Sequence, residues 1–178
     1  MHINYQFLAF ALLASSVAAT PVRTPSPPAK PPTPMPESEK PDKLYRNTGQ
    51  SPGQIEDAGG ASSWARTTGQ TPKYDVQDHA DPPTSDGKNE KNDGLVSFSR
   101  SQDVAKEWNP NGNVIQVDPK DKQTQVIDVN KKFPDNPYAH EDEFAVKDHA
   151  PAPTIDNIQQ MKDGNVDKTR TYNQPPSR

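Results

Sequence analysis

Two pairs of polar residues in this sequence have the types and spacing that catalytic sites use. The carboxylates Glu141 and Glu143 lie two residues apart, and the hydroxyls Ser97 and Ser99 repeat that spacing. Because residues two apart on a β-strand share a face, each pair would point to one side of a sheet. A fixed carboxylate can stabilise a developing positive charge, and the guanidinium of Arg46 suits a phosphate.

Each of these groups also has an explanation that involves no chemistry. The two glutamates, which flank Asp142, could form a solvated acidic edge. Ser97 and Ser99 could lie on the outer face of an edge strand, and Arg46 could be an ordinary surface residue. The spacing alone therefore leaves both interpretations open.

Several other kinds of site find no support in the sequence. The chain has no cysteine, which excludes disulfides and cysteine zinc sites, and it contains no phosphate-binding glycine loop. No dense run of Lys and Arg points to a nucleic-acid partner. No metal is expected, because no metal-ligand spacing occurs around the three histidines near acidic residues, which are His79, His140 and His149.

Taken in order, these segments resemble the mono-ADP-ribosyltransferases of the cholera toxin and heat-labile enterotoxin type. That family carries an Arg after a Tyr or Leu-Tyr, a Ser-Thr-Ser strand and a Glu-x-Glu pair. A segment at 77–80 (QDHA) is similar to a family segment with an Asp-His-Ala core. The resemblance covers roughly residues 42–160, and the matching segments are Leu44-Tyr45-Arg46, Ser97-Phe98-Ser99 and Glu141-Asp142-Glu143.

The resemblance implies a reaction and roles for six residues. The family breaks the bond between nicotinamide and ribose in NAD, through a transition state that resembles an oxocarbenium ion. Glu143 would stabilise that charge and Ser97 would hold Glu143 in position. Glu141 would contact the acceptor, which is usually an arginine guanidinium in relatives with both carboxylates. NAD is a substrate here, and the residues expected to bind it or to line its site are Arg46, His79 and Ser99.

Three positions depart from the family pattern. Relatives often have Asp two residues after the Arg and a second Arg four residues after it, where this chain has Thr48 and Gln50. Both changes bear on NAD affinity. Phe98 replaces the middle Thr of Ser-Thr-Ser, and strand alternation predicts that its side chain points opposite to Ser97, into the core.

Capping signals predict the helices that accompany these segments. Ser51 is a candidate cap for a helix over 51–59, and Ser101 for a short helix over 102–108. A last short helix is expected over 154–161.

The expected strands frame the carboxylate and serine pairs. A short strand is predicted over 95–99, and β-branched runs predict strands over 113–118 and 125–130. Each of the last two has one apolar and one mixed face, which indicates half-buried strands. Residues 73–94 are polar, and a loop is expected there. The resemblance implies an α+β fold of two small packed β-sheets with short helices around an NAD cleft.

The chain divides into four segments by composition. Residues 1–19 have the pattern of a secretory signal peptide, and 20–41 form a proline-rich linker. The ADP-ribosyltransferase-like domain is expected over 42–162, followed by a polar tail over 163–178. Hydrophobic residues make up only 29% of the chain, which contains 21 prolines and has a net charge of −4. This composition excludes an integral membrane protein.

The sequence therefore predicts a secreted toxin or effector that transfers ADP-ribose from NAD to an arginine of a host protein. NAD is scarce outside cells, so action inside a host cell is compatible with this hypothesis. No receptor-binding chain is expected within the sequence. Two alternatives remain open, which are a catalytically degenerate effector of the same fold that acts by binding, and a largely disordered proline-rich secreted protein.

Overall fold

The structure is a computed structural model that describes residues 32–81, 90–121 and 124–172. The expected signal peptide over 1–19 lies outside the described residues, as does most of the proline-rich segment. The strands are β1 (Leu44–Thr48), β2 (Gly60–Ser62), β3 (Leu95–Ser99), β4 (Asn113–Val117), β5 (Val126–Asp128), β6 (Glu143–Lys147), β7 (His149–Pro151), β8 (Ile155–Lys162) and β9 (Asn165–Thr171). The α-helices are α1 (Pro52–Asp57), α2 (Trp64–Thr68), α3 (Val76–Ala80), α4 (Gln102–Trp108) and α5 (Val129–Lys132). Three short 3-10 helices are η1 (Glu37–Glu39), η2 (Ala139–Glu141) and η3 (Ala152–Thr154).

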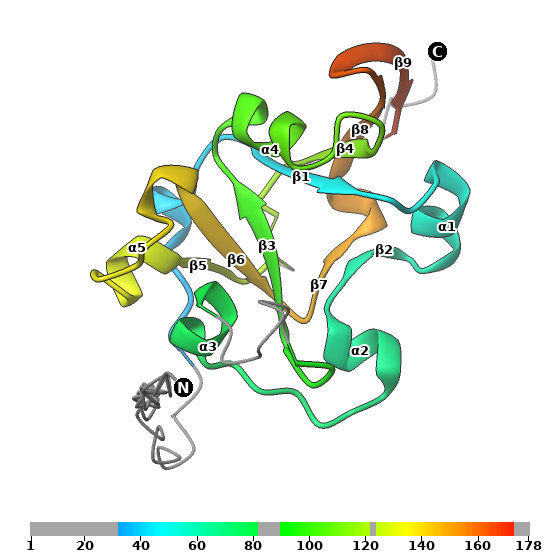
Figure 1. Cartoon of the computed structure of the whole chain (residues 1–178). Coiled ribbons are helices and arrows are strands. Elements are labelled where there is room, and N and C mark those ends of the chain that lie inside the picture. Colours follow the sequence, from blue (N-terminus) through cyan, green and yellow to red (C-terminus); the bar gives the residue numbers. More distant parts are fainter. Residues whose placement is uncertain (1–31, 82–89, 122–123, 173–178) are drawn as a thin grey trace, which may run out of the picture.

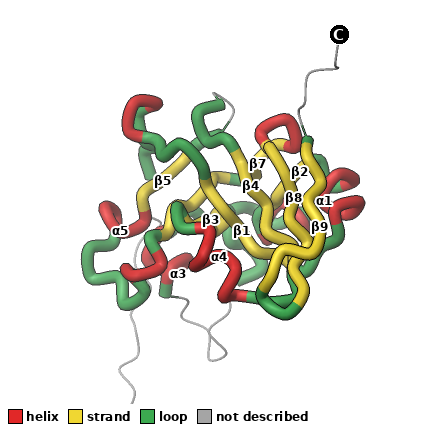
Figure 2. Tube along the Cα trace, turned by 90° about the horizontal axis from the view of Figure 1, so that it is seen from above, coloured by secondary structure: helices red, strands yellow, loops and turns green. Residues whose placement is uncertain are grey.

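Within the described residues the strands form a seven-stranded antiparallel sheet and a separate pair. The order in the large sheet is β5-β6-β3-β1-β4-β8-β9, and β2 pairs with β7. Figure 2 shows this succession across the molecule, from β5 at one end to β9 at the other. Only one residue pair, Tyr45 with Ser99, joins β1 to β3. The large sheet is therefore two half-sheets that part on either side of a single contact.

The main core is formed by apolar side chains from both half-sheets. Its fully buried members include Leu44 of β1, Ile115 of β4 and Val146 of β6. Phe98 belongs to this core and is 2% exposed, so the predicted orientation of its side chain is confirmed. Each Å² of apolar surface that these side chains bury stabilises the fold by about 25 cal/mol. This shared core holds the two half-sheets together although a single residue pair connects β1 to β3.

The expected strands over 95–99, 113–118 and 125–130 are confirmed as β3, β4 and the shorter β5. The expectation that both β-branched strands are half-buried was wrong for β4. This strand lies between β1 and β8, and its Val114, Ile115 and Val117 side chains are fully inaccessible. β5 lies at the sheet edge, and the chain leaves it at Asp128, whose carboxylate caps α5.

The helix expected over 154–161 was wrong, because this segment forms strand β8. Ile155, Ile158 and Met161 are buried at intervals of three, a spacing that also fits a helix. Two features reconcile it with a strand. A register shift opposite Gln116 and Val117 brings Ile155 and Ile158 into the main core, and Met161 is buried in a different cluster, with Ala105 and Val114. The expected polar tail from residue 163 begins with β9, which is exposed along its length and pairs with β8.

The short helices are fixed by side-chain caps. Ser51 accepts a hydrogen bond from the Gln54 amide and Ser101 from the Val104 amide, which confirms the helices expected there as α1 and α4. The segment 73–94 was expected to be loop-like, but it contains α3, capped by the carboxylate of Asp75. Figure 1 shows α4 against β1 and β3, and α3 beside α5 near β6.

The described end of the proline-rich segment packs against the domain rather than forming a free linker. The amide of Met35 donates to the carbonyl of Val126 at 2.7 Å. The buried ammonium of Lys40 donates to the carbonyl of Thr124 at 2.9 Å. None of the helices in the described ranges has the length and apolar character that crossing a bilayer requires.

Candidate active site

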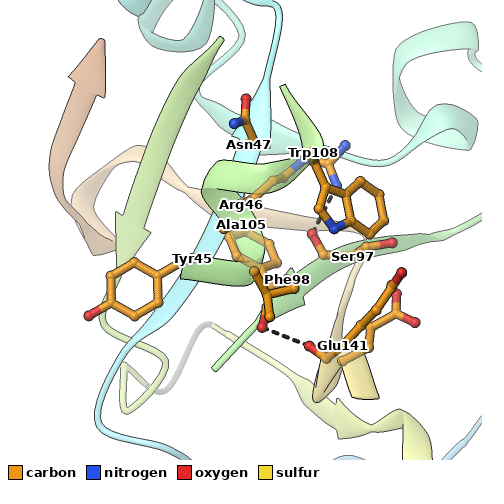
Figure 3. A pocket seen from close by; sticks show the side chains of 11 residues that line it. Tyr45, Arg46, Asn47, Ser97, Phe98, Ala105, Trp108 and Glu141 are labelled. Carbon is orange, nitrogen blue, oxygen red and sulfur yellow. Dashed lines mark hydrogen bonds between the residues drawn. The ribbon is translucent and has the colours of Figure 1, made fainter. Parts of the chain in front are cut away.

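The candidate site lies where β1 and β3 part. A small pocket there is lined by residues of β1, β3, α4 and the segment that leads into β6. Figure 3 shows Arg46, Ser97, Trp108 and Glu141 around this pocket. The structure thus brings the three predicted motifs, which lie up to 97 residues apart in sequence, to one place.

Arg46 connects the two half-sheets beside their single strand pair. Its Nη1 donates a hydrogen bond of 2.8 Å to the carbonyl oxygen of Ser97. Burial lowers the pKa of this guanidinium, while the nearby Glu143 and Asp93 carboxylates raise it, and an arginine stays charged in proteins throughout. Arg46 therefore supplies a fixed positive charge that is half-buried at the edge of the pocket.

Glu143 is the first residue of β6, and the imidazole of His79 contacts its carboxylate. We call the four residues joined by this imidazole the histidine cluster: His79, Asp93, Ser97 and Glu143. The Nε2 atom of His79 lies 3.2 Å from a carboxylate oxygen of Glu143 and 3.0 Å from the Ser97 hydroxyl. Its Nδ1 atom lies 2.6 Å from a carboxylate oxygen of Asp93. The side chain of His79 is 2% exposed and those of both carboxylates 9%.

The histidine cluster favours a positively charged imidazole. Burial lowers the pKa of His79, but hydrogen bonds and charge interactions with Asp93 and Glu143 outweigh burial and raise this pKa to about 9. This direction favours an imidazolium between the two buried carboxylates at neutral pH.

Glu141 reaches the pocket by a different route from the expected one. It ends the 3-10 helix η2, and Asp142 then takes a left-handed conformation with φ of 49° before β6 begins at Glu143. The two glutamates therefore do not share the face of one strand, which corrects the expectation, although both line the pocket. Burial and the negative charge of Glu143 raise the pKa of Glu141, and His140 opposes this effect.

Three predicted roles differ from the contacts in the structure. Ser97 reaches Glu143 through His79 rather than by a direct hydrogen bond among the contacts of the described residues. The Ser99 hydroxyl donates to the carbonyl of Glu141 at 2.8 Å and accepts from the Ser101 amide. His79 was expected to line the NAD site but lies behind Glu143. Ser99 and His79 thus contact the two glutamates, and of these two residues only Ser99 also lines the pocket beside Arg46.

A larger groove of about 520 Å³ adjoins the pocket and shares Arg46 with it. The groove includes Thr48 and Gln50, which stand where the family has Asp and Arg. The Thr48 hydroxyl accepts a hydrogen bond from the Gln50 amide, so it stabilises the turn into α1. Arg66 of α2 also lines the groove, so a second guanidinium is present although it comes from another element.

Sequence reasoning missed four residues of this region, for two reasons. Asp93 lies in a segment interpreted as a loop, so no strand or helix pattern linked it to His79. Arg66, Trp64 and Trp108 follow no family motif, and only the fold brings them to the groove or pocket. One signal was present: Trp64 and Trp108 are large apolar residues in polar surroundings, and their side chains are 53% and 60% exposed.

The described residues contain no group of three or more His, Asp or Glu side chains arranged to hold a metal ion. The acidic side chains of the histidine cluster are instead paired with the imidazole. The charged groups at the pocket and the groove are the guanidiniums of Arg46 and Arg66 and the carboxylates of Glu141 and Glu143.

Comparisons with known proteins identify the fold. No family model matches the sequence, and no curated protein is similar to it. A solved structure of a guanine-specific ADP-ribosyltransferase matches with a TM-score of 0.58 and 21% identity, over 75% of this chain and 78% of that one. A variant of Escherichia coli heat-labile enterotoxin matches with a TM-score of 0.55 and 18% identity, over 73% and 75%. A variant of the scabin toxin from Streptomyces scabies gives 0.57 and 16%, over 72% of each chain. The chain has the ADP-ribosyltransferase fold of the enterotoxin type.

Proposed function

We propose that the protein is an NAD-dependent mono-ADP-ribosyltransferase that modifies an arginine side chain of another protein. The observation that carries the proposal is the position of Glu143. Its carboxylate is 9% exposed, is held by His79 and lies at a pocket that opens beside Arg46. A buried carboxylate in fixed orientation is what the developing positive charge of NAD cleavage requires.

The reaction follows from these charges. The bond between the ribose C1′ and the nicotinamide nitrogen breaks, and its electron pair stays with the nicotinamide, which leaves as a neutral molecule. The ribose carbon then carries the positive charge of an oxocarbenium ion. In the proposal, Glu143 faces this carbon and its ribose hydroxyls, and the histidine cluster prevents the carboxylate from turning away.

The groove supports the binding of the remainder of NAD. Arg46 and Arg66 both line it, and two guanidiniums match the two phosphates of a dinucleotide in charge and in hydrogen-bonding geometry. Trp64 lies at the same groove with an exposed indole, on which an adenine could stack. Arg66 would thus supply the second positive charge that the family places where this chain has Gln50.

Glu141 is proposed to bind and activate the acceptor. Its carboxylate matches an arginine guanidinium, which must lose a proton as its nitrogen bonds to the ribose C1′. Glu141 would take that proton. Burial and the neighbouring Glu143 raise the pKa of Glu141, and a higher pKa makes a carboxylate a better base.

A guanine base is the second candidate acceptor, and one observation favours it. Trp108 lines the pocket with Glu141, and 60% of the Trp108 side chain is exposed. A guanine base could stack on the aromatic ring while two of its N–H groups face the carboxylate. The same ring and carboxylate also suit an arginine guanidinium. One solved structure with this fold is described as guanine-specific.

The proposal also includes that the protein is secreted and acts on a host protein. Residues 1–19 have the sequence pattern of a secretory signal, and two of the similar structures are described as an enterotoxin and a toxin. A toxin that enters another cell would meet abundant NAD there. Detection of the protein in culture medium, with its amino terminus at Thr20, tests this part separately.

The acceptor is tested with purified protein and NAD labelled in its adenylate moiety. Agmatine and guanosine are offered in separate reactions, and nicotinamide release is measured in each. The proposal predicts labelled agmatine, whereas labelled guanosine would establish the second candidate. Glu143→Gln should lower the rate of formation of both products by about 100- to 1,000-fold. Glu107 is an exposed carboxylate on α4, and Glu107→Gln should leave both rates unchanged. Absence of any product from a cooperatively folded protein would favour an effector that acts by binding.

A further inference from the structure

We propose, resting on the proposed function, that Asp93 is a positioning residue, which fixes His79 as a cation against the catalytic carboxylate of Glu143. Asp93 precedes β3 and is not part of any predicted motif. It touches neither the pocket beside Arg46 nor the groove, so its effect on the reaction would pass through His79.

The placement of two carboxylates around the imidazole favours a proton on each ring nitrogen. A neutral histidine has one N–H donor and one acceptor nitrogen. Here Nδ1 lies 2.6 Å from Asp93 and Nε2 lies 3.2 Å from Glu143, so a carboxylate faces each nitrogen. A carboxylate accepts hydrogen bonds only, so both contacts are satisfied when the ring is an imidazolium. The shorter contact belongs to Asp93.

Asp93 is itself held firmly. One of its carboxylate oxygens accepts from the Leu95 amide at 2.9 Å, while the other faces His79. Its main-chain carbonyl accepts from the Ala65 amide at 2.8 Å, and its amide donates to the carbonyl of Glu90. These bonds tie Asp93 to β3, α2 and the preceding turn. The imidazole is therefore oriented by a fixed group rather than by a mobile side chain.

The other charged groups around His79 do not replace this contact. Among the described residues, five other charged groups surround His79. Asp75 and Asp78 lie at its own helix, Lys73 and Glu90 lie in the flanking turns, and Arg46 interacts with both partner carboxylates. None of these five is named among the causes that raise the pKa of His79. Loss of Asp93 therefore leaves Glu143 as the main anion at the imidazole.

The arrangement has the order of a Ser-His-Asp triad but cannot act as one. The Ser97 hydroxyl lies 3.0 Å from Nε2, and Asp93 lies on the opposite nitrogen. In a hydrolase the imidazole must be neutral to accept the serine proton. Here Glu143 also faces Nε2, and in the proposal both nitrogens are protonated, so that the ring donates to Glu143. The structure therefore assigns this histidine to holding a carboxylate, not to activating Ser97.

Asp93→Asn is the variant that separates charge from shape. An asparagine oxygen can still accept from the Leu95 amide, but the negative charge facing Nδ1 is lost. NMR of the imidazole should show His79 protonated from pH 6 to pH 8 in the wild type, and deprotonating within that range in Asp93→Asn. Because only positioning is affected, kcat for NAD cleavage should fall about 10- to 100-fold while KM for NAD stays within twofold.

The matched control is Asp148→Asn. This half-buried carboxylate accepts a hydrogen bond of 2.6 Å from the Tyr74 hydroxyl and does not face His79. The control should change neither the His79 titration nor kcat. An unchanged His79 titration in Asp93→Asn would overturn the proposal, and so would a shifted titration with unchanged kcat in an active enzyme.

Failure of this proposal is distinguishable from failure of the proposed function. If the wild type does not cleave NAD, the proposed function is wrong and Asp93 has no reaction to serve, whatever the NMR shows. If the wild type is active but Asp93→Asn does not melt cooperatively, the NMR titration of His79 in the wild type decides. An imidazole that is neutral at pH 7.5 overturns the proposal, and a protonated imidazole supports it.

Discussion

Glu143 separates two regions that differ in almost every physical property. Behind it lie His79 and Asp93 of the histidine cluster, whose side chains are buried and paired with each other. In front of it lie the pocket and the groove, where Trp64, Trp108 and Arg66 are exposed. The closed region fixes one carboxylate, and the open region offers surfaces without fixed partners for substrates. We infer that the first governs bond cleavage and the second governs which molecules take part.

The two glutamates show the same contrast over two residues. Glu143 begins β6, where it pairs with Ser99 of β3, and the residues that follow it in β6 are paired with β5 as well. Glu141 ends a single 3-10 turn, where the Ser99 hydroxyl holds its carbonyl. The left-handed Asp142 between them turns the chain, so the two carboxylates occupy different environments. Different environments permit different roles.

The largest expected effect tests whether Glu141 and Glu143 have separate roles, as the contrast between the closed and the open region implies. Glu141→Gln should reduce transfer to agmatine by about 100- to 10,000-fold, because the amide cannot take the guanidinium proton. Nicotinamide release without acceptor should stay within a few-fold, because Glu143 is intact. Parallel assays of labelled agmatine and free nicotinamide measure the two rates. Equal loss of both rates would show that the roles are not separate.

The closed region predicts that stability depends on pH. His79 has an ordinary pKa near 6.5 and a folded-state pKa of about 9, so folding favours its charged form. This contribution is complete below about pH 6.5 and is lost as pH rises through 9. Between pH 7 and pH 9.5 the free energy of unfolding should therefore fall by about 2 to 3 kcal/mol.

Urea unfolding at a series of pH values measures this dependence. Asp93→Asn should flatten the slope, because the folded and unfolded pKa values of His79 then lie closer together. His149→Gln is the control: burial lowers the pKa of His149, so this residue has lost its proton before pH 7 in the folded state. A wild type whose stability is constant from pH 7 to pH 9.5 would contradict a charged His79.

In the open region, Arg66 should act on NAD binding alone. Arg66→Ala should raise KM for NAD about tenfold, the effect of losing one charge-assisted hydrogen bond at an exposed site, with kcat unchanged. Arg66→Lys should give a smaller increase, because it keeps the charge but loses the planar fork. Initial rates against NAD concentration distinguish these results. A fall in kcat instead would place Arg66 with the cleavage machinery.

The smallest expected effects are those of replacing the two exposed tryptophans, one at the pocket and one at the groove. Trp108→Ala should raise KM for the acceptor about 3- to 10-fold, while Trp64→Ala should raise KM for NAD by a similar factor. Each variant is the control for the other. Rates measured while one substrate is varied and the other saturates give both constants. Exchange of the two effects would reverse the assignment of pocket and groove.

Sequence reasoning succeeded where one local signal determined the structure. Ser51 and Ser101 are strong caps, so α1 and α4 were predicted, and β-branched runs marked β4 and β5. It failed where tertiary contacts decide. The three-residue spacing of Ile155, Ile158 and Met161 fits a helix, but a register shift in β8 and burial in two separate clusters produce this spacing in a strand.

The site was predictable to the extent that motifs carry it. The family resemblance brought Arg46, Ser97 and Glu143 to attention, and the structure places all three around one pocket. Asp93 could not be found in this way, because a lone aspartate in a polar segment has no pattern. Its position follows from α3, which turns His79 inward, and from the turn that leads into β3.

The most direct test of the central claim is nicotinamide release from NAD by the purified wild type and by Glu143→Gln. The variant keeps the shape of the side chain and its contact with His79 while removing the negative charge. We predict measurable release by the wild type and a loss of about 100- to 1,000-fold in kcat for the variant, with a cooperative melt in both. Equal release by the two proteins would contradict the role given to the buried carboxylate.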